Sequence, residues 1–308
     1  MKNVLVVPNP GKPAALELGG RLIDLLAGEG FTAALEESPA PPFQAAALGQ
    51  ASPRLFDNVD LVLVLGGDGS MLNAARRIYP RQIPLLGINL GQLGFLTTVE
   101  SNRLAEACHE LRLGNYQIED RVMLQGEIIS SPERATDESA GTFARVISTD
   151  GAAGDTPGHH LVGLNELVMA KSLLTRMIRL ETWIDDEYFT TYPADGLIVA
   201  TATGSTAYSL SAGGPIMDPR VAAIIMTPIC AHSLYARPVV LCPEAHIKVK
   251  IEAAHHEISL TADGQAEVKL SPGDEVRFFL APYVTKILRL NKHGIFETLR
   301  SRLKEGRI

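Results

Sequence analysis

The feature that most constrains the fold is the segment LVLVLGGDGSML at residues 61–72. Its first five residues, 61–65, are all apolar, which predicts a fully buried strand. Three glycines, Gly66, Gly67 and Gly69, follow this strand, and a helix-like pattern begins after them. A strand that runs into a glycine turn and then a helix is how α/β folds place backbone N–H groups against phosphates. The segment therefore predicts an α/β sheet with a phosphate-binding turn.

One carboxylate, Asp68, lies among these glycines. Phosphates repel a carboxylate, so an aspartate beside them is expected to have a functional role, such as accepting a proton or binding a metal ion. The alternative is that Asp68 only caps the following helix. The turn is not a dinucleotide fingerprint, because Leu72 stands where the third glycine belongs, and the only Gly-Lys pair is followed by Pro13, which excludes a P-loop.

Length and composition fit a globular protein of two domains: 308 residues, 46% of them hydrophobic and 20% charged. A formal charge of −7 argues against a nucleic-acid partner. We expect no membrane partner, because no apolar run approaches the roughly 18 residues of a spanning helix. The three cysteines, Cys108, Cys230 and Cys242, are scattered and form no C-x-x-C pair, which suits a reducing cytoplasm and gives no sign of a zinc site.

The first part of the chain alternates apolar strands with amphipathic helices, which predicts a doubly wound, mostly parallel sheet. The expected strands are residues 4–7, 31–35, 61–65 and 84–88, and the expected helices are 18–26, 70–78 and 104–113. A second glycine-rich loop, residues 89–96, leaves the carboxyl end of its strand. Ligands bind at such ends, so this loop and the Asp68 turn are expected to share a crevice, although a plain connection is the alternative. Arg76, Arg77 and Arg81 are interpreted as a solvated helix face.

After this part the pattern changes to short β-like runs, which predicts a β-rich, sandwich-like second domain. We place the domains at 1–118 and at 119–289, and we expect residues 290–308, with a helix at 295–303, to return to the first domain. Residues 178–184 alternate apolar and polar side chains, as a half-buried strand should. Residues 130–160 are rich in Ser, Thr, Asp, Gly and Pro and are interpreted as a mobile hairpin tip or insertion.

Polar groups interrupt the apolar strands of the second domain at two places. Asn165 and Glu166 lie inside a strand-like run, where they are costly unless they are hydrogen-bonded; the alternative is that one of them lies on the surface of the sheet. A hydroxyl-rich turn at 203–211, with Tyr208 in it, follows the strand that begins after Asp195. Such groups can recognise an adenine edge or a ribose, and Tyr208 can stack on a ring, although a helix cap is the alternative. His255 and His256 are adjacent in a strand-like run, so they point to opposite faces and cannot share a metal ion.

Four motifs together resemble the NAD kinase family in order and spacing: GGDGS at 66–70, NE at 165–166, ADGL at 194–197 and TGSTAYSLSAGGP at 203–215. The resemblance covers nearly the whole chain. The glycine–aspartate turn is shared with phosphofructokinases and with diacylglycerol and sphingosine kinases. The TGSTAY stretch with the preceding Asp-Gly pair is specific to the family.

The resemblance implies phosphoryl transfer from ATP, or another donor such as polyphosphate, to the adenosine 2′-hydroxyl of NAD. It makes Asp68 the general base, and it implies Mg²⁺ or another divalent cation with ATP, no metal ligand from the protein being identified. Family members are homodimers or homotetramers in which a neighbouring subunit can complete a site. The donor phosphates are assigned to Gly66, Gly67 and Gly69. The residues assigned to NAD are Asp68, Gly69, Phe95, Asn165, Glu166, Arg176, Asp195, Thr203, Thr206, Ala207, Tyr208, Ser209, Leu210, Ser211 and Gln265.

The chain departs from the family pattern at Ala202, where many members have proline, and at Pro193 and Asn73, where some bacterial members have a basic residue. Two other functions are weighed against the NAD kinase reading. A lipid or sugar kinase of the same superfamily is disfavoured because residues 203–211 supply polar contacts of the kind adenine needs. A non-catalytic NAD(P) sensor is disfavoured because it would gain nothing from the carboxylate of Asp68.

Overall fold

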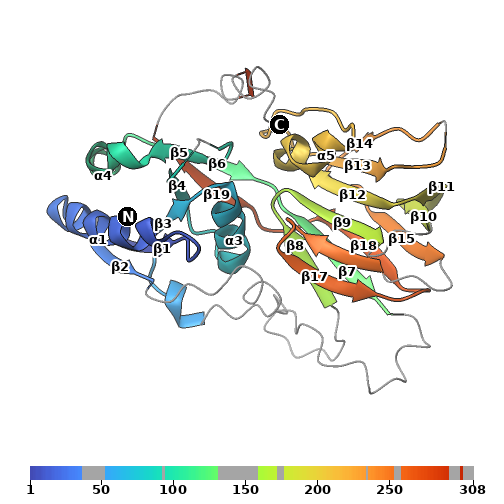
Figure 1. Cartoon of the computed structure of the whole chain (residues 1–308), viewed down its shortest axis with the longest axis horizontal. Helices are drawn as coiled ribbons and strands as arrows, with labels where there is room; N and C mark the ends of the chain where they lie inside the picture. The colour runs from blue at the N-terminus through green and yellow to red at the C-terminus, as the bar shows by residue number, and fades with distance from the viewer. Residues whose placement is uncertain are drawn as a thin grey trace. The chain divides into compact units, whose positions relative to one another are not determined.

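The computed structural model describes residues 1–36, 53–91, 94–130, 159–171, 177–233, 235–252, 258–290 and 299–300. These residues form two compact units (Figure 1). Unit 1 holds the N-terminal part of the chain up to Arg121 and the chain from Tyr283 onward, and unit 2 holds Val122–Pro282. The chain therefore leaves unit 1, builds unit 2 and returns.

A mostly parallel sheet forms the centre of unit 1. Its strand order is β2-β1-β3-β4-β19-β6, and β5 also pairs with β4. The strands are β1 (Asn3–Pro8), β2 (Thr32–Leu35), β3 (Leu61–Gly66), β4 (Leu85–Asn89), β5 (Thr97–Glu100), β6 (Gln117–Arg121) and β19 (Thr285–Arg289). Only β6 runs antiparallel to its neighbour, β19, among the described strands. All six residues of β3 are buried, because helices cover both faces of the sheet, and this explains its unbroken apolar run.

The helices of unit 1 confirm the doubly wound prediction. They are α1 (Pro13–Gly28), α3 (Asp68–Ile78) and α4 (Leu104–Leu113), with short 3-10 turns η1 (Pro53–Phe56) and η2 (Ser101–Arg103). Helices α1 and α4 contribute Leu22, Leu26 and Leu111 to one core cluster with the sheet, and α3 lies on the opposite face (Figure 1). Helix α4 ends as expected at Gly114, whose φ of +75° is left-handed.

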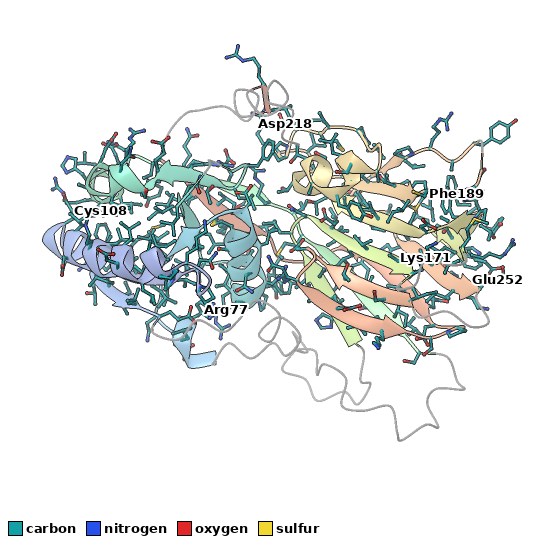
Figure 2. The ribbon with its side chains drawn as sticks, in the orientation of Figure 1. Arg77, Cys108, Lys171, Phe189, Asp218 and Glu252 are labelled. Atoms are coloured by element: carbon teal, nitrogen blue, oxygen red, sulfur yellow. The ribbon has the colours of Figure 1, made fainter. Side chains whose placement is uncertain are left out.

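One interpretation of the α3 surface is wrong. The Arg77 side chain is only 6% exposed and forms an ion pair with Glu36, which is also buried (Figure 2). Its guanidinium also lies 5.7 Å from the centre of the Phe56 ring. The sequence pattern put Arg77 on a solvated face because its ion-pair partner, Glu36, directly follows β2 and lies 41 residues earlier in the chain.

Unit 2 consists of two six-stranded antiparallel sheets. One has the order β11-β10-β15-β18-β7-β8, and the other has the order β14-β13-β12-β9-β16-β17. The bounds are β7 (Leu124–Ile129), β8 (His159–Gly163), β9 (Glu166–Lys171), β10 (Ile178–Ile184), β11 (Glu187–Ala194), β12 (Gly196–Thr201), η4 (Thr203–Thr206), α5 (Tyr208–Ser211), β13 (Ile224–Ile229), β14 (Val239–Leu241), β15 (Ile247–Glu252), β16 (Ile258–Ala262), β17 (Ala266–Leu270) and β18 (Glu275–Leu280).

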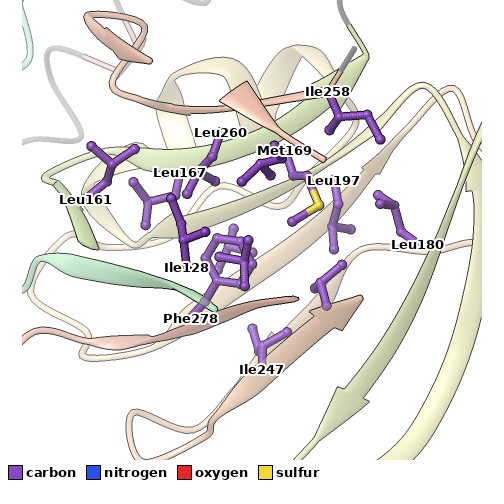
Figure 3. Close-up of a cluster of buried hydrophobic side chains, with 14 of the residues drawn as sticks. Ile128, Leu161, Leu167, Met169, Leu180, Leu197, Ile247, Ile258, Leu260 and Phe278 are labelled. Carbon is purple, nitrogen blue, oxygen red and sulfur yellow. The ribbon is translucent and has the colours of Figure 1, made fainter. Parts of the chain in front are cut away.

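The core of unit 2 lies between the two sheets, as in a sandwich (Figure 3). Phe278 and Ile247 come from one sheet, and Met169 and Leu197 come from the other, and all four are fully buried. Strand β10 buries every second side chain at its start, beginning with Ile178, so the predicted alternation is confirmed. Each strand thus presents one apolar face to the facing sheet.

Several sequence predictions fall outside the described residues: most of the 130–160 segment, the His255–His256 pair, Arg176 and nearly all of the C-terminal helix expected at 295–303. Among the residues that are described, no helix is long and apolar enough to cross a membrane.

Candidate active site

The Asp68 carboxylate is held by a second loop and does not cap its own helix. The N-cap of α3 is Gly67, which has no side chain to cap the helix, and Asp68 is the first helical residue. The carboxylate accepts hydrogen bonds from the backbone N–H groups of Phe95 at 2.7 Å, Leu96 at 3.0 Å and Thr97 at 3.2 Å. The alternative in which Asp68 only caps a helix is therefore wrong.

The two glycine-rich loops meet at Asp68 because β3 and β4 are parallel neighbours. Gly66 at the end of β3 lies beside Asn89 at the end of β4, so the loops that follow leave the same edge of the sheet. A Cβ atom added to Gly94 would lie 1.9 Å from Asp68 Oδ1. Residue 94 must therefore be glycine for the second loop to close over the carboxylate.

The region around the Asp68 turn has room and unused donors. A Cβ atom on Gly67 would meet no other atom within 4 Å, so open space adjoins the turn. Asp68 is in the first turn of α3, where the positive end of the helix dipole favours negative charge. The Nδ2 atoms of Asn73 and Asn89 are buried without a hydrogen-bond partner, so these two amides have donor capacity left over.

In unit 2 a second aspartate organises the Asn165–Glu166 motif. Asp263 accepts hydrogen bonds from three consecutive backbone N–H groups, those of Leu164 at 3.1 Å, Asn165 at 2.8 Å and Glu166 at 3.2 Å. Asn165 lies in the bend between β8 and β9, and Glu166 begins β9. The prediction that both residues lie inside a strand is therefore wrong for Asn165, because Asp263 bends the backbone there.

Glu166 has an unusual protonation equilibrium. Glu166 is only 7% exposed, and its Oε2 atom is buried without a hydrogen-bond partner. Burial, and after it the negative charge of Asp263, raises the pKa of Glu166 to about 8, although the backbone N–H of Tyr208 opposes the shift. At neutral pH the carboxyl group is therefore mostly protonated, and it can donate a hydrogen bond as well as accept one.

The hydroxyl-rich turn packs directly against the Asn165 backbone. The Thr201 hydroxyl donates to the Leu164 carbonyl at 2.7 Å, and the Thr201 N–H donates to the Asn165 carbonyl at 2.8 Å. A Cβ atom on Gly204 would lie 2.1 Å from the Asn165 carbonyl oxygen, so only glycine permits this approach. Two motifs that are about 40 positions apart in the sequence thus form one site in unit 2.

The other predicted residues of this turn differ in accessibility. Tyr208 is 45% exposed, and Ser211 is also exposed. Thr206, Ala207 and Leu210 are half-buried. Thr203 is buried, and its Oγ1 atom has no hydrogen-bond partner. Ser209 is fully buried, and its hydroxyl lies 3.0 Å from that of Thr227.

Two further predicted residues lie in connections between strands. Asp195, between β11 and β12, forms an ion pair with Lys171 (labelled in Figure 2), whose Nζ atom is 2.6 Å from Asp195 Oδ1. Gln265 is half-buried in the turn between β16 and β17. Asp263, which was not among the predicted site residues, opens this turn with a φ of +50°. An Asp-Gly pair in a sequence indicates a turn, but it does not reveal the hydrogen bonds that the aspartate side chain makes.

No cluster of three or more His, Cys, Asp or Glu side chains that could hold a metal ion occurs among the described residues. The two units offer different groups: a carboxylate fixed beside a glycine turn in unit 1, and a buried acid with hydroxyls and an aromatic ring in unit 2.

Two solved structures with a similar fold are an NADH kinase and an NAD kinase. Yeast NADH kinase, solved in complex with NADH, matches with a TM-score of 0.78 and 23% identity, over 99% of this chain and 88% of that one. An NAD kinase from Archaeoglobus fulgidus, solved in complex with ATP, matches with a TM-score of 0.70 and 21% identity, over 99% of each chain. At this level of identity the likeness establishes the class of fold.

Sequence comparisons establish the family. The model of the ATP-NAD kinase N-terminal domain matches residues 4–116, and that of the ATP-NAD kinase C-terminal domain matches residues 164–290. The NAD kinase of Citrifermentans bemidjiense is 38% identical over 99% of both chains, and that of Moorella thermoacetica is 39% identical over 99% of this chain and 90% of that one. The chain belongs to the NAD kinase family, and its activity is that of a phosphotransferase that uses ATP and NAD.

Proposed function

We propose that Asp68 is the general base that takes the proton from the adenosine 2′-hydroxyl of NAD as the terminal phosphoryl group of ATP is transferred to it. The observation that carries this proposal is the fixation of one carboxylate by three consecutive N–H groups at the carboxyl ends of two parallel strands. A base that is already oriented loses little entropy when the hydroxyl arrives. The 2′-hydroxyl of NAD would bind to the lone pairs of the Asp68 carboxylate that the N–H groups of the loop leave unoccupied.

The donor phosphates are assigned to the turn formed by Gly66, Gly67 and Gly69. The open space beside Gly67 and the dipole of α3 support this assignment. Mg²⁺ enters with ATP as part of the metal–nucleotide substrate, which is usual for this ion because it keeps several waters and binds through phosphates. In a loose phosphoryl-transfer transition state, catalysis consists mainly of alignment and charge neutralisation. Polyphosphate is proposed as an alternative phosphoryl donor, because it too carries a terminal phosphoryl group in a phosphoanhydride bond.

NAD, or NADH, is assigned to the unit 2 site around Glu166. Glu166 Oε2 and Thr203 Oγ1 are buried without hydrogen-bond partners, and unsatisfied polar atoms of this kind fit the two hydroxyls of a ribose. Tyr208 is exposed enough to stack on a ring. The remaining contacts are proposed for the residues that the family pattern indicates: Asp68, Gly69, Phe95, Asn165, Arg176, Asp195, Thr206, Ala207, Ser209, Leu210, Ser211 and Gln265.

Substitution of Asp68→Asn tests the base assignment. Activity is measured with ATP, Mg²⁺ and NAD, with NADP detected by an NADP-specific dehydrogenase, and NAD binding is measured by calorimetry. The variant should fold and bind NAD normally, while kcat falls by about 10²–10⁴-fold, the usual contribution of a general base. The matched control is Asp120→Asn, which removes an exposed carboxylate of the same unit. An unchanged kcat in the Asp68→Asn variant would show that Asp68 is not the base.

We also propose that the chain forms a homo-oligomer, a dimer or tetramer, and works in the cytoplasm. Strand β11 is at the edge of its sheet and exposes Tyr188 and Phe189, which are 56% and 44% exposed; Phe189 is labelled in Figure 2. Adjacent exposed aromatic side chains are typical of protein–protein contacts. The exposed free thiols of Cys230 and Cys242 fit a reducing compartment. Light scattering of the purified chain tests the first part, and a monomer at working concentration would contradict it.

A further inference from the structure

We propose that Arg289 is a positioning residue for phosphoryl transfer, which acts by fixing the peptide group between Phe95 and Leu96. The Nη2 atom of Arg289 donates a hydrogen bond to the Phe95 carbonyl oxygen at 3.1 Å. The N–H of the same peptide group belongs to Leu96, and it donates to Asp68 Oδ1 at 3.0 Å. This inference rests on the proposed role of Asp68 as the base.

The geometry of a peptide group makes this arrangement a clamp. A trans peptide is planar, and its C=O and N–H bonds point in opposite directions. Arg289 therefore holds one side of the Phe95–Leu96 peptide while Asp68 holds the other. Rotation of the peptide, which would turn the Leu96 N–H away from Asp68, would also break the bond to Arg289. A cation on the carbonyl oxygen also polarises the peptide and strengthens its N–H as a donor.

Arg289 is itself held firmly in place. It is the last residue of β19, which pairs with β6 in antiparallel register, so that Arg289 lies opposite Gln117. Its Nε atom donates to Glu119 Oε2 at 3.2 Å, and its side chain is only 13% exposed. Glu119 also pairs with Arg121, whose side chain is 3% exposed. The planar guanidinium thus bridges a side chain of the sheet and a carbonyl of the loop with donors in a fixed geometry, which the single ammonium group of a lysine does not provide.

Charge connects Arg289 to Asp68 as well. Burial lowers the pKa of the Arg289 guanidinium, and the negative charges of Glu119 and Asp68 oppose that effect, while nearby Arg121 adds to it. Arginine remains protonated in proteins, so Arg289 keeps its positive charge behind the loop. The loop backbone lies between this charge and the carboxylate of Asp68, and both partners hold the loop in one conformation.

The test compares kinetics of Arg289→Met and Arg289→Lys with those of a control, Lys286→Met. Lys286 is in the same strand and pairs with Asp120 of β6, so its substitution also removes a cation and an ion pair from the β19–β6 ladder. For Arg289→Met we expect kcat to fall by about tenfold to a hundredfold, as misplacement of a catalytic group does. The KM for NAD should change by less than about threefold, because the affected group acts in the transition state. Arg289→Lys should recover part of the loss, and Lys286→Met should leave both constants unchanged.

A double-mutant cycle separates positioning from general stability. If Arg289 acts through Asp68, adding Arg289→Met to Asp68→Asn should reduce the residual activity by less than about twofold, since interacting residues are not additive. An equal loss in both backgrounds, or a normal kcat for Arg289→Met, would overturn the inference. If Asp68→Asn alone kept its activity, the proposed base would fail instead, so the two failures are distinguishable. Should Arg289→Met fail to fold, the same cycle with Arg289→Lys decides the question.

Discussion

The protonated state of Glu166 yields a prediction that depends on pH. Gln has the same shape as a protonated glutamic acid, with a donor and an acceptor, but it cannot ionise. Substitution of Glu166→Gln should therefore preserve the neutral site and remove its pH dependence. The matched control is Glu187→Gln, because Glu187 is exposed on β11 of the same unit.

The magnitude follows from the difference between the ordinary pKa of 4.5 and the value of about 8 in the folded protein. Between these pH values the folded protein keeps a proton that the unfolded chain has released. The free energy of unfolding therefore falls as the pH rises through this window. Each pKa unit corresponds to about 1.4 kcal/mol, so the full difference corresponds to a loss of about 5 kcal/mol, which is complete only above pH 8. Water that enters the site reduces this loss, which makes the figure an upper bound.

Two measurements test the prediction. Carbon-13 NMR of glutamate-labelled protein should show one carboxyl resonance that titrates near pH 8 and is missing from the Glu166→Gln spectrum. The KM for NAD should rise as the pH passes 8 in the unsubstituted protein, because the acid loses the proton that it donates. In the Glu166→Gln variant the KM should not rise in this way, and the Glu187→Gln control should behave like the unsubstituted protein.

A Glu166 resonance that titrates below pH 5 would refute the reasoning, because burial and the neighbouring Asp263 would then fail to favour the neutral acid. A Glu166→Gln variant whose KM rises above pH 8 as steeply as that of the unsubstituted protein would refute the link to NAD binding. The first result concerns the electrostatics of the site and the second concerns its function, so each idea can fail separately.

Two other substitutions probe the aspartates that hold the loops. Gly94→Ala places a methyl group against the Asp68 carboxylate, and kcat should fall by about a hundredfold; the control Gly20→Ala, at an open helix position, should leave kcat unchanged and raise stability by about 0.5–1 kcal/mol. Asp263→Asn keeps the left-handed turn, but its amide cannot accept all three hydrogen bonds; local stability should fall by about 1–3 kcal/mol, seen as faster hydrogen exchange at residues 164–166. The Glu166 titration should also move to lower pH, and an unmoved midpoint would show that burial alone sets it.

The sequence was sufficient for the features that depend on local patterns. The unbroken apolar run of β3 and the alternation in β10 predicted a buried strand and a half-buried strand, because side-chain periodicity reports how many faces of a strand are covered. The glycines around Asp68 predicted a turn, because glycine tolerates close approach of the backbone. These patterns identified the two kinds of domain and the motifs of the family.

The positions of the hydrogen-bond partners could not be predicted in this way. Phe95 is 27 residues from Asp68, Glu166 is 97 residues from Asp263, and Arg289 is 194 residues from Phe95. No periodic pattern connects residues at such separations, since only the pairing of strands brings them together. The burial of Arg77 was missed for the same reason, because its partner, Glu36, is 41 residues away in the chain.

The chemical state of the site likewise depends on the tertiary structure. Glu166 is an ordinary acid in the unfolded chain, and its pKa rises only when the fold removes water from it and places Asp263 nearby. The sequence by itself thus indicated candidate residues for the chemistry and the kinds of element that hold them. The folded structure decided which of those groups are charged, fixed or unsatisfied, because desolvation and hydrogen bonding depend on neighbours that are distant in the chain.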